Sequence, residues 1–150
     1  LPSDFRDVIT SQFTKAFGEE PVSIGGQSNL YHYYAEYIIR SAKPESKMGI
    51  ILDNKWYHNR YGEPLREFIL RNCIIDAIIE YPSQSFFEGA IVSTTILVMK
   101  KRKTNCCIVN SFRKTASYEN QTRFIRCSSD PRETSIEVIK QLVQLLEVTS

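Results

Sequence analysis

The segment of residues 48–66 constrains the fold of this chain more than any other part of the sequence. It begins with a short continuous apolar run, residues 48–52, which is typical of a central strand covered on both faces. Asp53-Asn54 ends that run, and Pro64 stands where the first turn of a helix tolerates proline. Because ligands of open α/β sheets bind beyond the carboxyl ends of strands, residues 53–61 are the first candidates for a functional site.

Length and composition describe an ordinary globular domain. The chain has 150 residues, which is enough for a single domain with a substantial core. No apolar run approaches the length of a membrane span, and no signal peptide opens the sequence. Leu1 is not a start methionine, so we expect a processed chain or, as the favoured alternative, a fragment excised from a longer protein.

The cysteines and histidines show no metal-binding pattern. The sequence holds no Cys-x-x-Cys pair and its two histidines are scattered, so we expect no metal site. Adjacent cysteines in an apolar strand are usually buried free thiols. The four cysteines therefore indicate an intracellular, reduced protein; they are Cys73, Cys106, Cys107 and Cys127.

Apolar periodicity predicts helices and strands that alternate along the chain. The predicted helices are residues 1–17, 28–42 and 63–72 and a last helix beginning between 130 and 137; the predicted strands are residues 48–52, 73–81, 91–99 and 106–112. Too few residues separate the second and third strands for a crossover helix, so we expect these two to be antiparallel. The sequence therefore predicts an α/β sheet with a reversed strand near one edge.

The second predicted helix carries four tyrosines. Helical spacing places one set of side chains on a common inward face: Tyr31, Tyr34, Ala35, Ile38 and Ala42. Exposed aromatic side chains can stack on nucleic-acid bases, but aromatic residues at helical spacing usually belong to a core. We therefore expect this face to pack inward.

Residues 100–126 are strongly basic, with eight basic residues and one acidic residue, Glu119. Such a segment can face nucleic-acid phosphates. The alternative is a solvated hairpin edge on which lysines discourage edge-to-edge pairing. Both interpretations stay open, and the residues by themselves slightly favour the second.

Four short motifs follow one another in the first two thirds of the chain. They are Asn29-Leu30-Tyr31-His32-Tyr33-Tyr34, Lys43-Pro44 followed by Gly49 and the strand that ends at Asp53-Asn54, Tyr61-Gly62 followed by Leu65-Arg66 and Phe68-Ile69, and Phe87-Glu88-Gly89-Ala90 followed by a Thr-rich strand. In this order, over roughly residues 29–101, they resemble the second half of the catalytic domain of adenine-specific (N6) DNA methyltransferases of restriction–modification systems.

The resemblance implies a fold and an activity. It implies that residues 1–150 form a single, partial catalytic domain. This domain would be part of a Rossmann-like methyltransferase sheet with a terminal antiparallel β-hairpin and flanking helices. Residues 102–150 would add a strand and a C-terminal helix. The parent enzyme would use S-adenosylmethionine to methylate adenine in double-stranded DNA, in the cytoplasm of a bacterium or archaeon, with a specificity or restriction subunit as a further partner.

The family's catalytic and cofactor motifs are missing from this sequence. Neither Asn-Pro-Pro-Tyr/Phe, which accepts hydrogen bonds from the target amine, nor a glycine-rich loop after a strand is present. We therefore expect no catalytic residue in this chain, no bound S-adenosylmethionine and no activity of the chain alone.

The resemblance also implies site residues. Phe87 matches the family phenylalanine that packs against a base flipped out of the duplex; otherwise it plugs a hairpin turn. Asn54 is expected to hydrogen-bond a base or the backbone, or to cap its own loop. Candidate phosphate contacts, which solvation alone would equally explain, are Lys55, His58, Arg60, Lys101, Arg102 and Lys103. The alternative function is a non-catalytic module that binds nucleic acid or a partner subunit.

Overall fold

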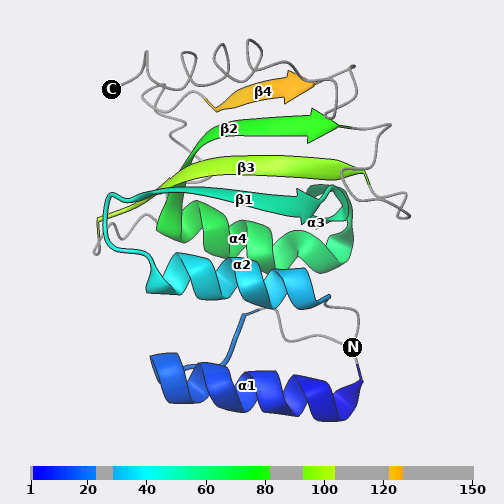
Figure 1. The fold of residues 1–150 in the computed structure, drawn as a ribbon, viewed down its shortest axis with the longest axis vertical. Coiled ribbons are helices and arrows are strands. Elements are labelled where there is room, and N and C mark those ends of the chain that lie inside the picture. The colour runs from blue at the N-terminus through cyan, green and yellow to red at the C-terminus, as the bar shows by residue number, and fades with distance from the viewer. Residues whose placement is uncertain (1, 23–28, 82–92, 104–121, 127–150) are drawn as a thin grey trace.

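The computed structural model of this chain describes residues 2–22, 29–81, 93–103 and 122–126. They form a four-stranded sheet with helices packed against one of its faces and one further helix beyond them (Figure 1). The helices are α1 (Ser3–Phe17), α2 (Leu30–Ser41), α3 (Lys55–His58), the 3-10 turn η1 (Arg60–Gly62) and α4 (Glu63–Asn72). The strands are β1 (Lys47–Asp53), β2 (Cys73–Tyr81), β3 (Thr94–Lys101) and β4 (Arg123–Arg126).

These elements confirm the first three predicted helices and the first three predicted strands to within a few residues. The predicted strand over residues 106–112, the last helix and Phe87 lie outside the described residues. Strand β4 was not predicted, because it falls in a polar stretch that shows no clear periodicity. None of the described helices has the length and apolarity that crossing a membrane requires.

The strand order is β1-β3-β2-β4, and β3 runs against both of its neighbours. The predicted antiparallel pairing of β2 with β3 is therefore confirmed. Strand β4 pairs with β2 in parallel. As a result β1, β2 and β4 all end on the same side of the sheet, where α3 follows β1 (Figure 1). This side, formed by the carboxyl ends of the three strands, is called the strand edge.

The core lies between the sheet and the two helices α2 and α4. It is made of fully or almost fully buried side chains from these elements and from α3: Ala35, Ile39, Ile50, Leu52, Trp56, Leu65, Ile69, Cys73, Leu97 and Met99. Leu65 and Ile69 of α4 are completely buried and Phe68 is partly buried, as predicted. Cys73 is a buried free thiol, and burial raises its pKa to about 11. The adjacent cysteines for which buried free thiols were predicted, Cys106 and Cys107, lie outside the described residues.

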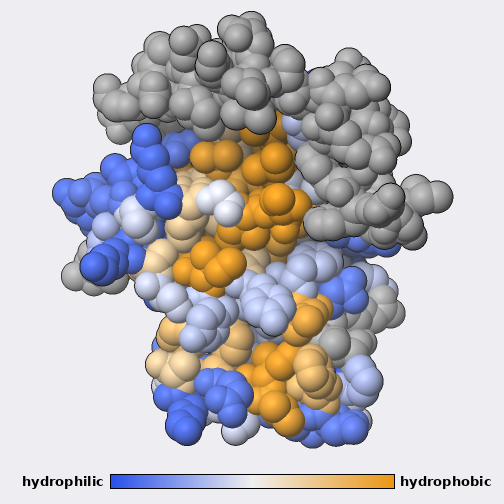
Figure 2. Space-filling view, in the orientation of Figure 1, coloured by the Kyte–Doolittle hydropathy of each residue, from blue (hydrophilic) through white to orange (hydrophobic). Residues whose placement is uncertain are grey.

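The prediction that β1 is a central strand covered on both faces is wrong. Among the described strands β1 is an outermost strand with a neighbour on one side alone, and its Ile51 is 54% exposed. Successive side chains of a strand point to opposite faces, and α2 and α4 cover only the face of Ile50 and Leu52. Figure 2 shows the resulting apolar surface over the middle of the sheet.

The predicted inward face of α2 is also partly wrong. Tyr34 and Ile38 are 60% and 40% exposed, whereas Tyr33 and Ile39 are buried. The helix is rotated because it also packs against α1, where the ring of Tyr33 meets that of Phe13 edge-on. Tertiary packing on two sides, which the apolar spacing does not encode, thus decides which face of α2 is buried.

Candidate functional site

The turn that follows β1, residues 54–62, is held in one conformation by neighbouring side chains. One oxygen of Asp53 accepts the backbone N–H of Lys55 at 3.0 Å, which satisfies a donor at the start of α3. From α4, the Nη1 group of Arg66 donates to the carbonyl oxygens of Trp56 at 2.8 Å and Asn59 at 2.9 Å. These bonds make the turn a preformed part of the strand edge.

Asn54 sits at the start of this turn. Its backbone N–H donates to the carbonyl of Ser93 at 2.9 Å, which ties the end of β1 to the beginning of β3. Its side chain makes no capping hydrogen bond to α3, and the carboxylate of Asp53 serves the N–H of Lys55 instead. The geometry therefore does not support the loop-capping interpretation of Asn54, whose amide makes no hydrogen bond to the described residues.

A buried carboxylate lies beneath the same turn. The side chain of Glu80, near the end of β2, is only 6% exposed. The hydroxyl of Tyr57 donates to one of its oxygens, and Nε2 of His58 lies 3.9 Å from that oxygen. The second oxygen faces Nε of Arg126, on β4, at 3.3 Å. Burial, and then the hydrogen bond to this carboxylate, raise the pKa of Tyr57 to about 12.

The first turn of α2 lies near the end of β1. Nδ1 of the buried His32 accepts the backbone N–H of Asn29 at 3.1 Å, so the first motif of the sequence forms a helix cap. Burial lowers the pKa of His32, while nearby Asp53 acts in the opposite direction. Burial and Asp53 together raise the pKa of Tyr31 to about 12. Tyr31 and His32 of the first motif thus lie close enough to Asp53 of the second motif for its charge to act on both.

Three buried polar groups at this end of the sheet have no hydrogen-bond partner among the described residues. They are Nε2 of His32, the indole Nε1 of Trp56 and the hydroxyl of Thr95. Buried polar groups in native proteins are nearly always hydrogen-bonded. These three groups are exceptions to that rule within the described part of the chain.

The predicted phosphate contacts fall into two separate groups. Lys55, His58 and Arg60 share the turn with Asn54, and the side chains of Lys55 and His58 are 62% and 60% exposed. The second group, Lys101, Arg102 and Lys103, lies at the opposite end of β3, roughly 20 Å away by strand geometry.

The second group is engaged within the fold. Nζ of Lys101 donates to the carbonyl of Ile39 at 2.8 Å, and Nε of Arg102 donates to that of Cys73 at 3.0 Å. Lys103 lies 3.3 Å from the carboxylate of Glu45. The structure therefore brings the first group together with Asn54 and places the second elsewhere.

Glu80 and Arg126 are members of this site that sequence reasoning missed. The signal for Glu80 was a carboxylate within an otherwise apolar strand, Cys-Ile-Ile-Asp-Ala-Ile-Ile-Glu-Tyr. Arg126 gave no such signal, because only the parallel pairing of β4 with β2 brings it opposite Glu80.

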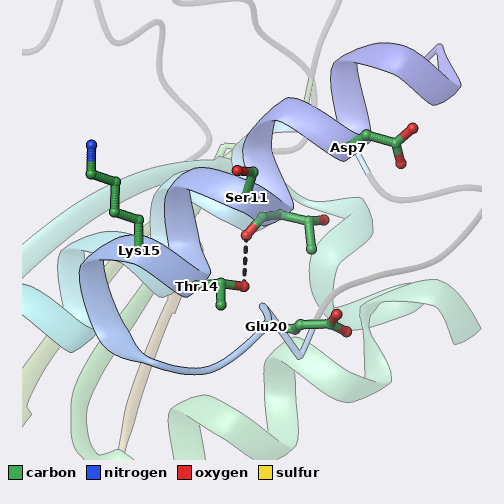
Figure 3. Close-up of a pocket in the computed structure, with 6 residues that line it drawn as sticks. Asp7, Ser11, Thr14, Lys15 and Glu20 are labelled. Atoms are coloured by element: carbon green, nitrogen blue, oxygen red, sulfur yellow. Dashed lines mark hydrogen bonds between the residues drawn. The ribbon is translucent and has the colours of Figure 1, made fainter.

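A polar hollow of about 550 Å³ lies away from the strand edge, along α1. Figure 3 shows Asp7, Ser11, Thr14 and Lys15 projecting from successive turns of the helix, with Glu20 from the following loop. The drawn hydrogen bond, from the hydroxyl of Thr14 to the carbonyl of Thr10, is an ordinary bond within a helix. The polar lining of the hollow thus comes from one helix and the loop that follows it.

The fold of the chain is similar to those of solved structures. A class I S-adenosylmethionine-dependent methyltransferase from Listeria monocytogenes superposes with a TM-score of 0.56, covering 83% of this chain and 34% of that protein at 18% identity. The type IIG restriction endonuclease BpuSI gives a TM-score of 0.55, covering 67% of this chain and 12% of the endonuclease, also at 18% identity. The fold is therefore that of the S-adenosylmethionine-dependent methyltransferases.

Sequence comparison places the chain within that class. The Eco57I restriction-modification methylase family matches residues 7–87, more than half of the chain, and the chain belongs to this family. Type II methyltransferase M.BanIII of Aneurinibacillus aneurinilyticus is 29% identical over 79 residues, and M.BstVI of Geobacillus stearothermophilus is 24% identical over 98 residues. The matched part is 53% and 65% of this chain but only 14% and 18% of those two proteins.

The described residues do not fit the cofactor that the fold implies. A methyltransferase holds S-adenosylmethionine on a glycine-rich loop after a strand, whereas β1 here is followed by Asn54 and Lys55. The described glycines, Gly18, Gly49 and Gly62, stand far apart in the sequence. The described part of the chain therefore shows no glycine-rich loop of the kind that holds this cofactor.

Proposed function

We propose that this chain forms the DNA-facing side of the active site in a site-specific adenine-N6 DNA methyltransferase of a restriction–modification system. Membership of the Eco57I methylase family supports the class of enzyme. The observation that carries the proposal is the turn after β1, which is fixed by Asp53 and Arg66 and leaves the side chain of Asn54 without a capping role.

The proposed chemistry of this edge is recognition of a base that has left the duplex. An extruded base exposes its hydrogen-bonding edge, and an asparagine amide can both donate to adenine and accept from it. We assign that contact to Asn54. Phe87 is proposed to stack on the same base, which would return roughly 1–3 kcal/mol of the stacking energy lost on extrusion.

Phosphates on either side of the extruded base would meet the cations of the same turn. Lys55 and His58 are exposed there, and Arg60 follows them in the next turn of chain. Lys101, Arg102 and Lys103 are assigned no such contact in this proposal, because they lie at the far end of β3 from Asn54.

The methyl donor and the catalytic motif would come from another part of the parent protein. S-adenosylmethionine supplies the methyl group in this class of enzyme. The residues of this chain would bind and orient the base and the DNA backbone, and the chain alone would be inactive. Its partners would be double-stranded DNA and, in the assembled system, a specificity or restriction subunit.

Replacement of Asn54 in the parent protein tests this function. DNA from cells that express the parent protein is expected to contain N6-methyladenine, measured by mass spectrometry of digested nucleosides. The variant Asn54→Ala should methylate roughly tenfold more slowly or worse, since each lost hydrogen bond in the transition state costs about 1–3 kcal/mol. Asn59→Ala, in the same turn, is the matched control and should keep the wild-type rate. Methylation of cytosine alone, or equal rates for both variants, would contradict the proposal.

A non-catalytic module that binds nucleic acid or a partner subunit is the second candidate. The observation that favours it is the exposed cations of the turn beside a fold that shows no cofactor cradle in its described residues. This candidate predicts binding of duplex DNA by the chain and no modified base in DNA from cells that express its parent protein.

A further inference from the structure

Glu80 joins three elements that are distant in the sequence. Its two carboxylate oxygens receive Tyr57 from α3 and Arg126 from β4, while Glu80 itself belongs to β2. A buried carboxylate with charged and hydrogen-bonding partners on both oxygens is costly to disturb, so the groups around it are held in place. The end of β4 is thereby fixed beside the turn that carries Asn54.

At the strand edge, acidic side chains are less exposed than basic side chains. The carboxylate side chains of Glu80 and Asp53 are turned inward, at 6% and 18% exposure. The cationic side chains of Arg126 and Lys55 are turned outward, at 66% and 62% exposure. Solvent therefore meets the positive groups, and the anions that balance them are screened behind them.

Arg126 has a geometry suited to a phosphate. Its Nε lies 3.3 Å from a carboxylate oxygen of Glu80, and within the described part of the chain its two terminal nitrogens make no ion pair. A guanidinium can bind a phosphate through two parallel hydrogen bonds. An arginine that is already oriented loses less conformational freedom when it binds.

We propose that Arg126 is a DNA phosphate-binding residue at the edge that carries Asn54, and that Glu80 is the positioning residue that holds it there. The proposal rests on the DNA-facing role given to this edge above. It adds a residue from a strand that lies outside the stretch matching the family, residues 7–87. The parallel pairing of β4 with β2 places Arg126 beside Glu80, at the edge where β1 also ends.

The salt dependence of DNA binding tests this assignment. A fluorescein-labelled duplex of about 20–30 base pairs is titrated with the chain at several salt concentrations, and log K is plotted against log salt; each phosphate contact contributes about 0.9 to the slope. For Arg126→Gln we expect weaker binding and a slope smaller by about 1. Arg126→Lys, which keeps the charge, should restore the slope but not the full affinity.

Two further variants separate positioning from simple charge. Arg71→Gln removes an exposed cation that is paired with Glu67 on α4, away from the strand edge, and should leave the slope unchanged. Glu80→Gln removes a negative charge, so bulk electrostatics alone predicts tighter binding. We expect weaker binding instead, because Arg126 loses its anchor. Emission of Trp56, the chain's one tryptophan and a buried one, reports whether each variant is folded.

The possible outcomes distinguish the two proposals. If the wild-type chain binds DNA but Arg126→Gln and Arg71→Gln have the same slope, or if Glu80→Gln binds more tightly, the assignment of Arg126 and Glu80 is overturned while the proposed function stands. If the wild-type chain shows no salt-dependent binding, the DNA-facing role itself fails, and this inference fails with it. Should Glu80→Gln fail to fold, the comparison of Arg126→Gln with Arg71→Gln decides alone.

Discussion

The guanidinium of Arg66, on α4, lies under the turn after β1 and donates to the carbonyl oxygen of Trp56 at 2.8 Å. The same Nη1 group reaches the carbonyl of Asn59 at 2.9 Å. One charged side chain therefore donates to two backbone carbonyls of the turn, and that of Asn59 also accepts the N–H of Gly62 at 3.1 Å. This contact links the packing of α4 in the core to the position of the residues proposed to meet DNA.

Replacement of Arg66 by alanine is expected to destabilise the protein by about 1.5–3 kcal/mol, because two carbonyl groups lose a charged donor. Urea unfolding followed by the fluorescence of Trp56 measures the change in the free energy of unfolding. Arg71→Ala is the control, since its ion pair with Glu67 is exposed on both sides and should contribute little. Equal loss for the two variants would show that Arg66 does not hold the turn.

Gly62→Ala should be strongly destabilising for a steric reason. A Cβ at this position would lie 1.9 Å from the carbonyl oxygen of Trp56, so the backbone of the turn must move. We expect a loss of about 2 kcal/mol or more in the free energy of unfolding, measured by urea titration. Gly49→Ala is the matched control, because a Cβ there meets no atom within 4 Å and its effect should be small. A neutral Gly62→Ala would disprove the close approach.

Leu65→Ala tests whether α4 and β1 share one core. Leu65 is completely buried in the core cluster, so its truncation should cost about 2–5 kcal/mol from lost apolar contact and the cavity that remains. Leu70, on the same helix, is 38% exposed and Leu70→Ala should cost much less. Thermal or urea unfolding of both variants gives the comparison. Similar losses would mean that α4 does not pack as described.

Stability should fall as the pH drops below about 6.5, through His32. Burial lowers the pKa of His32 in the folded protein, so the unfolded chain binds the proton more readily. The stability present above the unfolded pKa is therefore lost as the pH falls toward the folded pKa. Urea unfolding at pH 7.5 and 5.5 should show this loss in the wild type and less of it in His32→Gln, which keeps an acceptor for the helix cap.

The second histidine provides the control for this pH dependence. His58→Gln leaves the buried His32 in place, so the loss of stability that His32 causes at pH 5.5 should remain. If His58→Gln removed the pH dependence and His32→Gln retained it, the buried state of His32 would be wrong. The two variants together cover both histidines of the chain.

The sequence by itself determined the local elements and part of the site. Apolar spacing located α4 with Leu65 and Ile69 inward, and a short connection fixed the antiparallel sense of β2 and β3. The motif order also pointed to the turn that begins at Asn54, where the structure places a preformed loop. These properties depend on residues close together in the chain, so periodicity and turn chemistry encode them.

Only the tertiary structure decided which strand lies at the edge, which face of α2 is buried, and which charges meet. Arg126 lies beside Glu80 because β4 pairs in parallel with β2. Lys101 donates a hydrogen bond to the carbonyl of Ile39, which is 62 residues away in the chain. Such contacts join residues far apart in the chain, and the backbone hydrogen bonds that set strand pairing are the same for every residue type. No local pattern records them, because they follow from how the finished elements pack together.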